Sequence, residues 1–315
     1  MDPGQEVTYR RYDDWKSGPL PKLERVIWRM VPSAGNRRAL IERGDADISF
    51  NMPPRDVSEM LEQNKLKVVG TPADNTLLFI DMNVKMPPFD NIKVHQAVAC
   101  AIPYQKIMDA AIYGRGNAMF GGPAKVTSPV WPQPSPYNTD MAKAKRLLTE
   151  AGFPNGFETT LSFDLGAAVV NEPICELVQE SLGQIGIKVS LNKVPGANWR
   201  AELIKKTFPM VLNLFGGWLN FPEYFFFWNY HSQNSLYNSM NYQNPVMDKL
   251  IETARFESDP KKYKEDVEDF ITLAFTEMPR IPLFQPSIDV VMQKNVTGYR
   301  YWFHRQLDYR QLAKA

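Results

Sequence analysis

The 315-residue sequence has few of the residues that build disulfide frameworks, metal centres and thiol active sites. It contains two cysteines, Cys100 and Cys175, and three histidines, His95, His231 and His304. Both cysteines fall on apolar faces of predicted helices, so we expect buried free thiols. The histidines are far apart in the sequence and lack metal-ligand spacing, which favours packing or surface roles. We therefore expect no metal and no other cofactor.

The sequence also lacks long apolar runs, an excess of charge and the common catalytic motifs. Its longest apolar stretches, such as 211–215, are far too short to span a bilayer. A formal net charge of +1 gives no field that would attract nucleic acid. There is no P-loop, no G-x-S-x-G, no H-E-x-x-H and no G-x-G-x-x-G beside a strand. Residues 1–6 have no basic or apolar leader pattern, so we expect no signal peptide in this chain.

What the sequence does contain is an alternation of strand and helix patterns. Apolar residues with a period of two predict strands, and apolar residues at helical spacing predict helices between them. Glycines such as Gly44, Gly152 and Gly186 end predicted helices. The Gly-, Pro- and Ser-rich stretch 115–139 predicts a long loop. The pattern indicates an α/β fold, with strands predicted at 23–30, 45–50, 66–69, 76–82, 158–163, 187–191, 210–215, 281–284 and 289–292.

Two breaks in composition predict how the chain divides into domains. The first is Lys85–Pro88 and the second is Pro279–Pro286. A chain of this length has room for about two domains. We therefore predict that 85–284 forms one inserted domain and that 1–84 and 285–315 belong together.

Several short motifs, in the same order along the chain, resemble those of the family 5 bacterial solute-binding proteins. Any one motif is weak, whereas the ordered set is specific. The motifs are YRRYDDW at 9–15, LIERGDADI at 40–48, a stretch over 83–97 that includes PPFDN and HQA, DMAKAKRLLTEAGF at 140–153, LGQIGIKV at 182–189, and NYQNP with Asp248 and Leu250.

The resemblance implies a fold, a function and a location. The fold would be like a type II periplasmic binding protein, with mixed sheets flanked by helices. Because family members are longer, lobe one (1–84 and 285–315) would be incomplete and lobe two (85–284) complete. The protein would not be an enzyme. It would capture a peptide-like, opine or other small polar solute in the periplasm or cell envelope, deliver it to ABC permease subunits, and be a monomer when full length.

The resemblance also implies where the ligand binds. The family's second lobe offers a tryptophan followed by an acidic residue just after a buried strand, and here that place holds Trp218 and Asn220. Phe221 and Tyr224 follow in the same segment. Asn220 is neutral, so it cannot supply the charge-assisted hydrogen bond that an aspartate gives to a peptide amine. This favours an uncharged, hydroxylated or cationic solute.

Two further ligand residues are expected from other segments. Asn83 begins one of the family motifs, and Asp164 lies in the loop 163–168. In dipeptide-binding members the matching loop carries an arginine that holds the ligand carboxylate, and here there is none. Asp164 would instead meet a cation or remain a solvated loop residue.

Three alternatives stay open. The aromatic residues of 221–231 stack on a ligand or, especially over 225–228, form the core beneath the cleft. Glu223 and Asp164 are the one carboxylate pair to test for a glycoside hydrolase. Exposed aromatics on an incomplete lobe would also suit a chaperone-like peptide-binding module.

Overall fold

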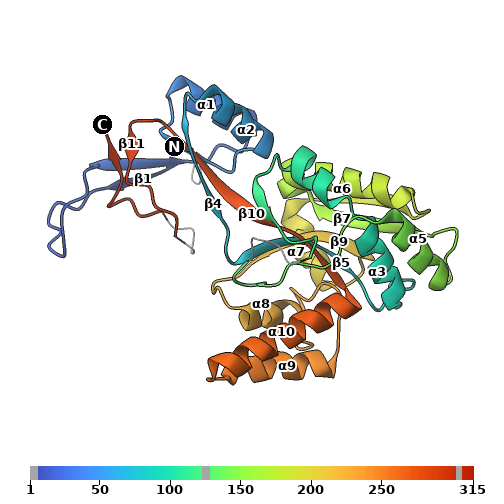
Figure 1. Ribbon diagram of the computed structural model, residues 1–315. Coiled ribbons are helices and arrows are strands. Elements are labelled where there is room, and N and C mark those ends of the chain that lie inside the picture. The colour runs from blue at the N-terminus through green and yellow to red at the C-terminus, as the bar shows by residue number, and fades with distance from the viewer. Residues whose placement is uncertain (1–5, 123–127, 303–306) are drawn as a thin grey trace. The chain divides into compact units, whose positions relative to one another are not determined.

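The computed structural model describes residues 6–122, 128–302 and 307–315, and the chain in it divides into two compact units (Figure 1). Unit 1 comprises 1–71 and 287–315, and unit 2 comprises 72–286. Strand β5 (Thr76–Met82), which the sequence assigns to the first domain, pairs with β9 (Met210–Gly216) inside unit 2. The assignment of 1–84, 285–315 and 85–284 to lobes of a longer protein stays a prediction. His304 lies outside the described residues.

The core of unit 1 lies beneath two short helices. Helix α1 (Ala34–Arg43) begins at Ser33, whose hydroxyl caps the Asn36 N–H, and ends at Gly44 in the left-handed conformation. Helix α2 (Pro54–Gln63) follows β3 (Ile48–Phe50) and precedes β4 (Lys67–Pro72). Apolar side chains from both helices meet strand β10 (Arg280–Met292) in a small buried cluster: Ile41, Met52, Val57, Met60, Leu66 and Val291.

Unit 1 also contains two small sheets. Strands β1 (Glu6–Arg10) and β2 (Arg25–Arg29) form an antiparallel ribbon. Strands β11 (Val296–Thr297) and β12 (Ala313–Lys314) form another two-stranded sheet near the end of the chain. Within the described residues, neither small sheet pairs with the larger sheet that contains β3 and β10.

Unit 2 is built on a mixed sheet. Strand β5 lies between β10 and β9 and is antiparallel to both. Strand β7 (Glu158–Asp164) is parallel to β9 on one side and to β8 (Lys188–Val194) on the other. The short β6 (Gly116–Ala118) pairs with β10.

Helices cover this sheet in two groups (Figure 1). Helix α3 (Ile92–Ala101) packs on α5 (Met141–Glu150), while α6 (Ala168–Gly183) packs on β7 and β8. A second group contains α8 (Pro222–Asn229), α9 (Pro245–Phe256) and α10 (Pro260–Glu277). The remaining helical pieces are α4 (Tyr104–Lys106), a π-turn at Ile107–Ala111, a 3₁₀ turn at Leu165–Ala167, and α7 (Gly196–Ile204).

Two features differ from the sequence predictions. The strands predicted at 281–284 and 289–292 form one continuous strand, β10, that passes through Pro282 and Pro286. Each proline lacks the N–H that would donate to a neighbouring strand. The pairing of β10 with β5 shifts register between Pro282 and Phe284, and this irregularity accommodates the missing donor at Pro282. The predicted loop 115–139 contains β6 and also buries Trp131 completely.

The prediction of buried free thiols is confirmed for Cys100 and Cys175. Burial raises the pKa of both thiols, most strongly for Cys175. The reactive form is the thiolate, so both groups are expected to resist an aromatic disulfide reagent at pH 8 while the protein is folded. Two thiols per chain should react in denaturant, as counted from the absorbance of the released chromophore. Rapid reaction of either thiol in the native protein would contradict this burial.

Candidate functional site

Three parallel strands of unit 2 end at the same edge of its sheet. Residue pairing aligns Asp164 of β7 with Val194 of β8, and Phe163 of β7 with Leu212 of β9. Strand β9 runs on to Gly216 before the chain turns into α8. Ligands of α/β proteins bind beyond the carboxyl ends of such strands. The loop after β9, 217–221, is therefore the natural starting point for a site.

This loop is fixed to the sheet by Asn75, a buried residue just before β5. The Asn75 side-chain amide donates to the Gly217 carbonyl at 2.5 Å, and the Gly217 N–H donates to the Asn75 carbonyl at 3.0 Å. Sequence reasoning did not find Asn75, because its partner is 142 positions away and no local motif signals the contact.

Tyr224 packs against the other side of the same loop. A Cβ atom added to Gly217 would lie 2.6 Å from Cε1 of the Tyr224 ring. Only glycine fits at position 217 unless the ring moves, so the close approach requires this residue type. Tyr224 is half-buried and also makes an edge contact with Trp228. It thus positions the loop, whatever contact it makes with a ligand.

The loop presents large apolar side chains to solvent. Trp218 is 79% exposed and Phe221, which directly precedes α8, is 52% exposed. In contrast, Phe225 and Phe226 on α8 are fully buried. The sequence left core and stacking roles open for this aromatic segment. The structure gives the core role to Phe225 and Phe226 and leaves Trp218 and Phe221 accessible.

Asn220 lies between these two exposed aromatics and is half-buried. Its Oδ1 atom is inaccessible and has no hydrogen-bond partner among the described residues. A buried acceptor without a donor costs free energy, which a donor brought by a ligand or by loop movement would recover.

Asp164 lies at the same edge of the sheet, at the end of β7. Its Oδ1 accepts a hydrogen bond of 2.7 Å from the Gly166 N–H and so caps the 3₁₀ turn. A Cβ atom added to Gly196, at the start of α7, would lie 3.2 Å from this oxygen. Asp164 therefore shapes the ends of β7 and β8 at the edge where β9 also ends.

Asn83 is separated from the other predicted ligand residues. Its buried side-chain amide donates to the carbonyl of Lys206 at 2.9 Å, and its side-chain oxygen accepts from the Lys85 N–H at 3.2 Å. The backbone N–H of Asn83 bonds to Pro209, directly before β9, whereas Trp218 follows the far end of that strand. A seven-residue strand is roughly 20 Å long. Asn83 braces a turn and is left out of the candidate site.

The carboxylate pair considered for glycoside hydrolysis is engaged in structural contacts. The Tyr263 hydroxyl on α10 donates to Glu223 Oε2 at 2.6 Å. Burial raises the pKa of Tyr263, and the bond to Glu223 raises it further. Asp164 is the cap of the turn described above. The geometry gives no support to a hydrolase.

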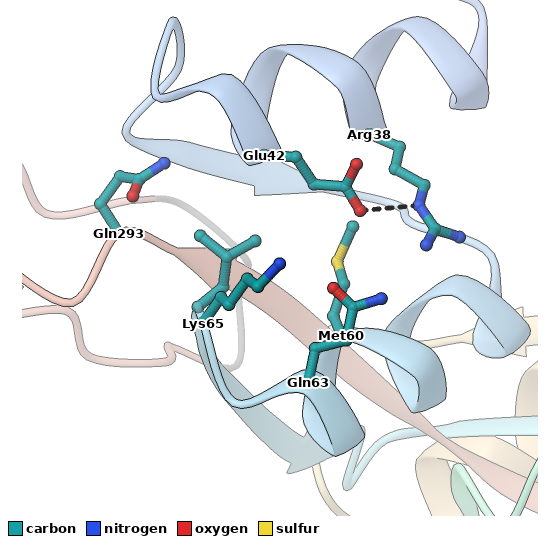
Figure 2. A pocket seen from close by; sticks show the side chains of 7 residues that line it. Arg38, Glu42, Met60, Gln63, Lys65 and Gln293 are labelled. Carbon is teal, nitrogen blue, oxygen red and sulfur yellow. Dashed lines mark hydrogen bonds and ion pairs between the residues drawn. The ribbon is translucent and has the colours of Figure 1, made fainter.

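Unit 1 has a separate polar hollow of 320 Å³ between α1 and α2 (Figure 2). Arg38 lines it and bonds to Glu42, Asp56 and Glu59 at 2.6–2.9 Å. The bond to Arg38 lowers the pKa of Glu59, and the same contacts raise the pKa of Arg38 above its usual value. Arg38 is thus fully engaged by acidic side chains of unit 1, and we assign no ligand to this hollow.

The described residues contain no cluster of three His, Cys, Asp or Glu side chains that would hold a metal ion. None of their helices has the length and apolar character needed to cross a membrane.

Comparison with known proteins decides the family. Residues 1–237 match the family model described as "Bacterial extracellular solute-binding proteins, family 5 Middle". The chain belongs to this family. Proteins of family 5 are binding proteins, and the resemblance drawn from the short motifs is confirmed.

Curated relatives include glutathione-binding proteins. GsiB of Escherichia coli (strain K12) is 30% identical over 295 residues, covering 90% of this chain and 56% of that protein. GsiB of Salmonella typhi is 30% identical over 294 residues with the same coverage. The chain thus spans little more than half the length of these relatives.

Solved structures confirm the type II periplasmic binding protein fold. The Helicobacter pylori DppA complex with the peptide STSA superposes with a TM-score of 0.84 at 21% identity, covering 98% of this chain and 60% of DppA. Oligopeptide-binding AppA of Bacillus subtilis, in complex with a nonapeptide, superposes with a TM-score of 0.80 at 25% identity, covering 100% of this chain and 65% of AppA. The mixed α/β architecture predicted from the sequence is therefore confirmed.

Proposed function

We propose that this chain forms the solute-contacting part of a binding subunit for an ABC importer in the periplasm or cell envelope. The observation that carries the proposal is the exposed Trp218, held beyond the carboxyl end of β9 by Asn75 and Tyr224. An exposed aromatic beside an unpaired acceptor suits capture of a polar solute with an apolar or ring-shaped part. The solute is bound and released unchanged, and the permease subunits are the partners.

The solute class that we favour is peptide-like or opine-like. Relatives are named for glutathione, and similar structures hold the peptides STSA and a nonapeptide or agropinic acid. Asn220 and the arginine-free loop 163–168 weaken recognition of both ends of a simple zwitterionic dipeptide. We therefore place opines and longer peptides, which offer contact groups besides two charged ends, ahead of free dipeptides.

A thermal-shift screen with short peptides, glutathione, opines, sugars and nickel chelates tests this proposal. A ligand that binds only the folded state raises the melting temperature with its concentration. Each hit is then incubated with the protein and quantified, and we expect it to be recovered intact. Consumption of a hit would overturn the binding function, and stabilisation by sugars alone would overturn the favoured solute class.

Replacing Trp218 with alanine is expected to weaken binding of any such hit by about 1–3 kcal/mol, because the ring loses its stacking and its buried area. Isothermal titration calorimetry measures the change. Phe256→Ala is the matched control, since Phe256 is also a highly exposed aromatic, at 82%, but belongs to helix α9 and not to the loop 217–221. Equal affinities for wild type and Trp218→Ala would remove Trp218 from the site.

A further inference from the structure

Helix α8 connects the site loop 217–221 to the helices of unit 2. It begins directly after Phe221, and the Phe225 N–H donates to the Phe221 carbonyl at 3.1 Å, so the end of the loop belongs to the first helical turn. Phe221 stands at the cap position, and its side chain has no group that could bond to the first N–H groups of the helix. The position of this turn therefore depends on contacts made by its other side chains.

Two neighbouring residues of the first turn make contacts in different directions. Glu223 Oε2 accepts the bond of 2.6 Å from the Tyr263 hydroxyl on α10. Tyr224 packs on Gly217, where its ring occupies the space that a Cβ atom would need. Successive residues of a helix point about 100° apart, so one of them binds α10 while the next holds the loop. The first turn of α8 thus links Tyr263 to Gly217.

Tyr263 is well placed to hold Glu223. It is the fourth residue of α10, and its N–H donates to the carbonyl of the capping residue Asp259 at 2.9 Å. Its half-buried ring packs against the core of unit 2. Burial raises the pKa of Tyr263 and the bond to Glu223 raises it further, so the hydroxyl keeps its proton at neutral pH. A phenol that donates to a carboxylate makes a charge-assisted bond, which is stronger than a neutral one.

The rest of α8 is anchored separately. Asn229, its last residue, is fully buried, and its Oδ1 accepts a hydrogen bond from the Arg280 guanidinium. Phe226, in the middle of the helix, packs on Phe270 of α10 with ring centroids 4.4 Å apart. Loss of the bond from Tyr263 would therefore free the first turn and leave the remainder of the helix in place.

We propose that Tyr263 is a positioning residue of the candidate site. Through Glu223 and Tyr224 it holds the loop 217–221, which carries Trp218, against the end of the sheet. Without the hydroxyl, the first turn of α8 loses its bond to α10, the Tyr224 ring moves, and the loop opens more often. That this loop binds solute rests on the proposed function, whereas the role of Tyr263 rests on contacts within unit 2.

Hydrogen exchange of the Gly217 N–H, measured by NMR, reports how often the loop opens, because its bond to the Asn75 carbonyl protects this group. Tyr263→Phe keeps the ring and removes only the hydroxyl. It should speed the exchange about fivefold, the effect of losing one hydrogen bond. The amide of Leu161, inside β7, is the reference and should keep its rate. Unchanged exchange at Gly217, or an equal increase at Leu161, would overturn the proposal.

Tyr242→Phe is the matched control. The Tyr242 hydroxyl also donates to a glutamate of unit 2, Glu277, but neither residue belongs to α8 or to the loop. This variant should leave the exchange of Gly217 as in wild type. Acceleration equal to that in Tyr263→Phe would show that any lost tyrosine bond loosens the loop, and would remove the special role of Tyr263.

Substitutions of Glu223 give a readout that general destabilisation would not produce. Glu223→Gln retains an acceptor and should largely preserve slow exchange at Gly217, whereas Glu223→Ala should accelerate it as Tyr263→Phe does. The double variant Glu223→Ala with Tyr263→Phe should be no faster than either single variant, because all three lose the same bond. Additive effects would contradict the proposal. These measurements need no solute, so a solute screen without hits leaves the role of Tyr263 standing, and a negative result here leaves the proposed function standing.

Discussion

Replacing Asp81 with alanine is expected to destabilise unit 2 by about 3–5 kcal/mol, because it would leave the Arg280 guanidinium buried without its counter-charge. Both side chains are almost completely inaccessible. Arg280 Nε lies 2.6 Å from Asp81 Oδ1, and its Nη2 lies 2.8 Å from Oδ2. The Ser239 hydroxyl also donates to Asp81, and the guanidinium lies over the Phe79 ring at 3.7 Å.

Urea denaturation followed by circular dichroism measures the effect. Glu158→Ala is the matched control, since its pair with Lys188 is largely exposed on both sides and should contribute less than about 1 kcal/mol. The double variant Asp81→Leu with Arg280→Met should be more stable than Asp81→Ala, because no buried charge is left unpaired. A loss below about 1 kcal/mol for Asp81→Ala would show that the guanidinium finds another partner or water.

The second large effect is expected at Trp131. Its ring is fully buried and contacts Phe226, Phe275 and Phe225, with ring centroids 4.8, 5.6 and 5.9 Å apart. Trp131→Ala should cost about 3–5 kcal/mol of the free energy of unfolding, since it removes this contact area and leaves a cavity among rigid rings.

Trp218→Ala is the natural comparison for this prediction. It deletes the same side chain from an exposed site in unit 2 and should change stability by no more than about 0.5 kcal/mol. The two variants thus separate a tryptophan that stabilises the fold from one that is available for binding. Similar urea midpoints for both would contradict the assigned roles.

The sequence predicted the elements whose signals are local. Gly44 ends α1 and Gly152 follows the end of α5, both in the left-handed conformation, as the sequence predicts. Buried strand β9 was also predicted, because a short apolar run is a local signal, whereas Trp218 after it was singled out from the family resemblance.

Contacts between distant residues could not be predicted in this way. Asn75 binds Gly217, and Asp81 binds Arg280, which is 199 positions away. Neither contact has a spacing rule, since only the folded sheet brings β5 beside β9 and β10. The burial of Trp131 could not be predicted for a different reason. The Pro- and Gly-rich composition around it predicts a surface loop. Asn83 was assigned to the ligand from a family motif, although its amide braces the turn before β9.

The limits of unit 2 have a consequence for protein engineering. The unit is one uninterrupted stretch, 72–286, and the Ala73 N–H at its start bonds to the Pro286 carbonyl at its end over 2.9 Å. A segment whose entry and exit adjoin can be inserted into a host loop without pulling the host apart. Unit 2, which includes Trp218, is therefore suited to insertion into a loop of another protein.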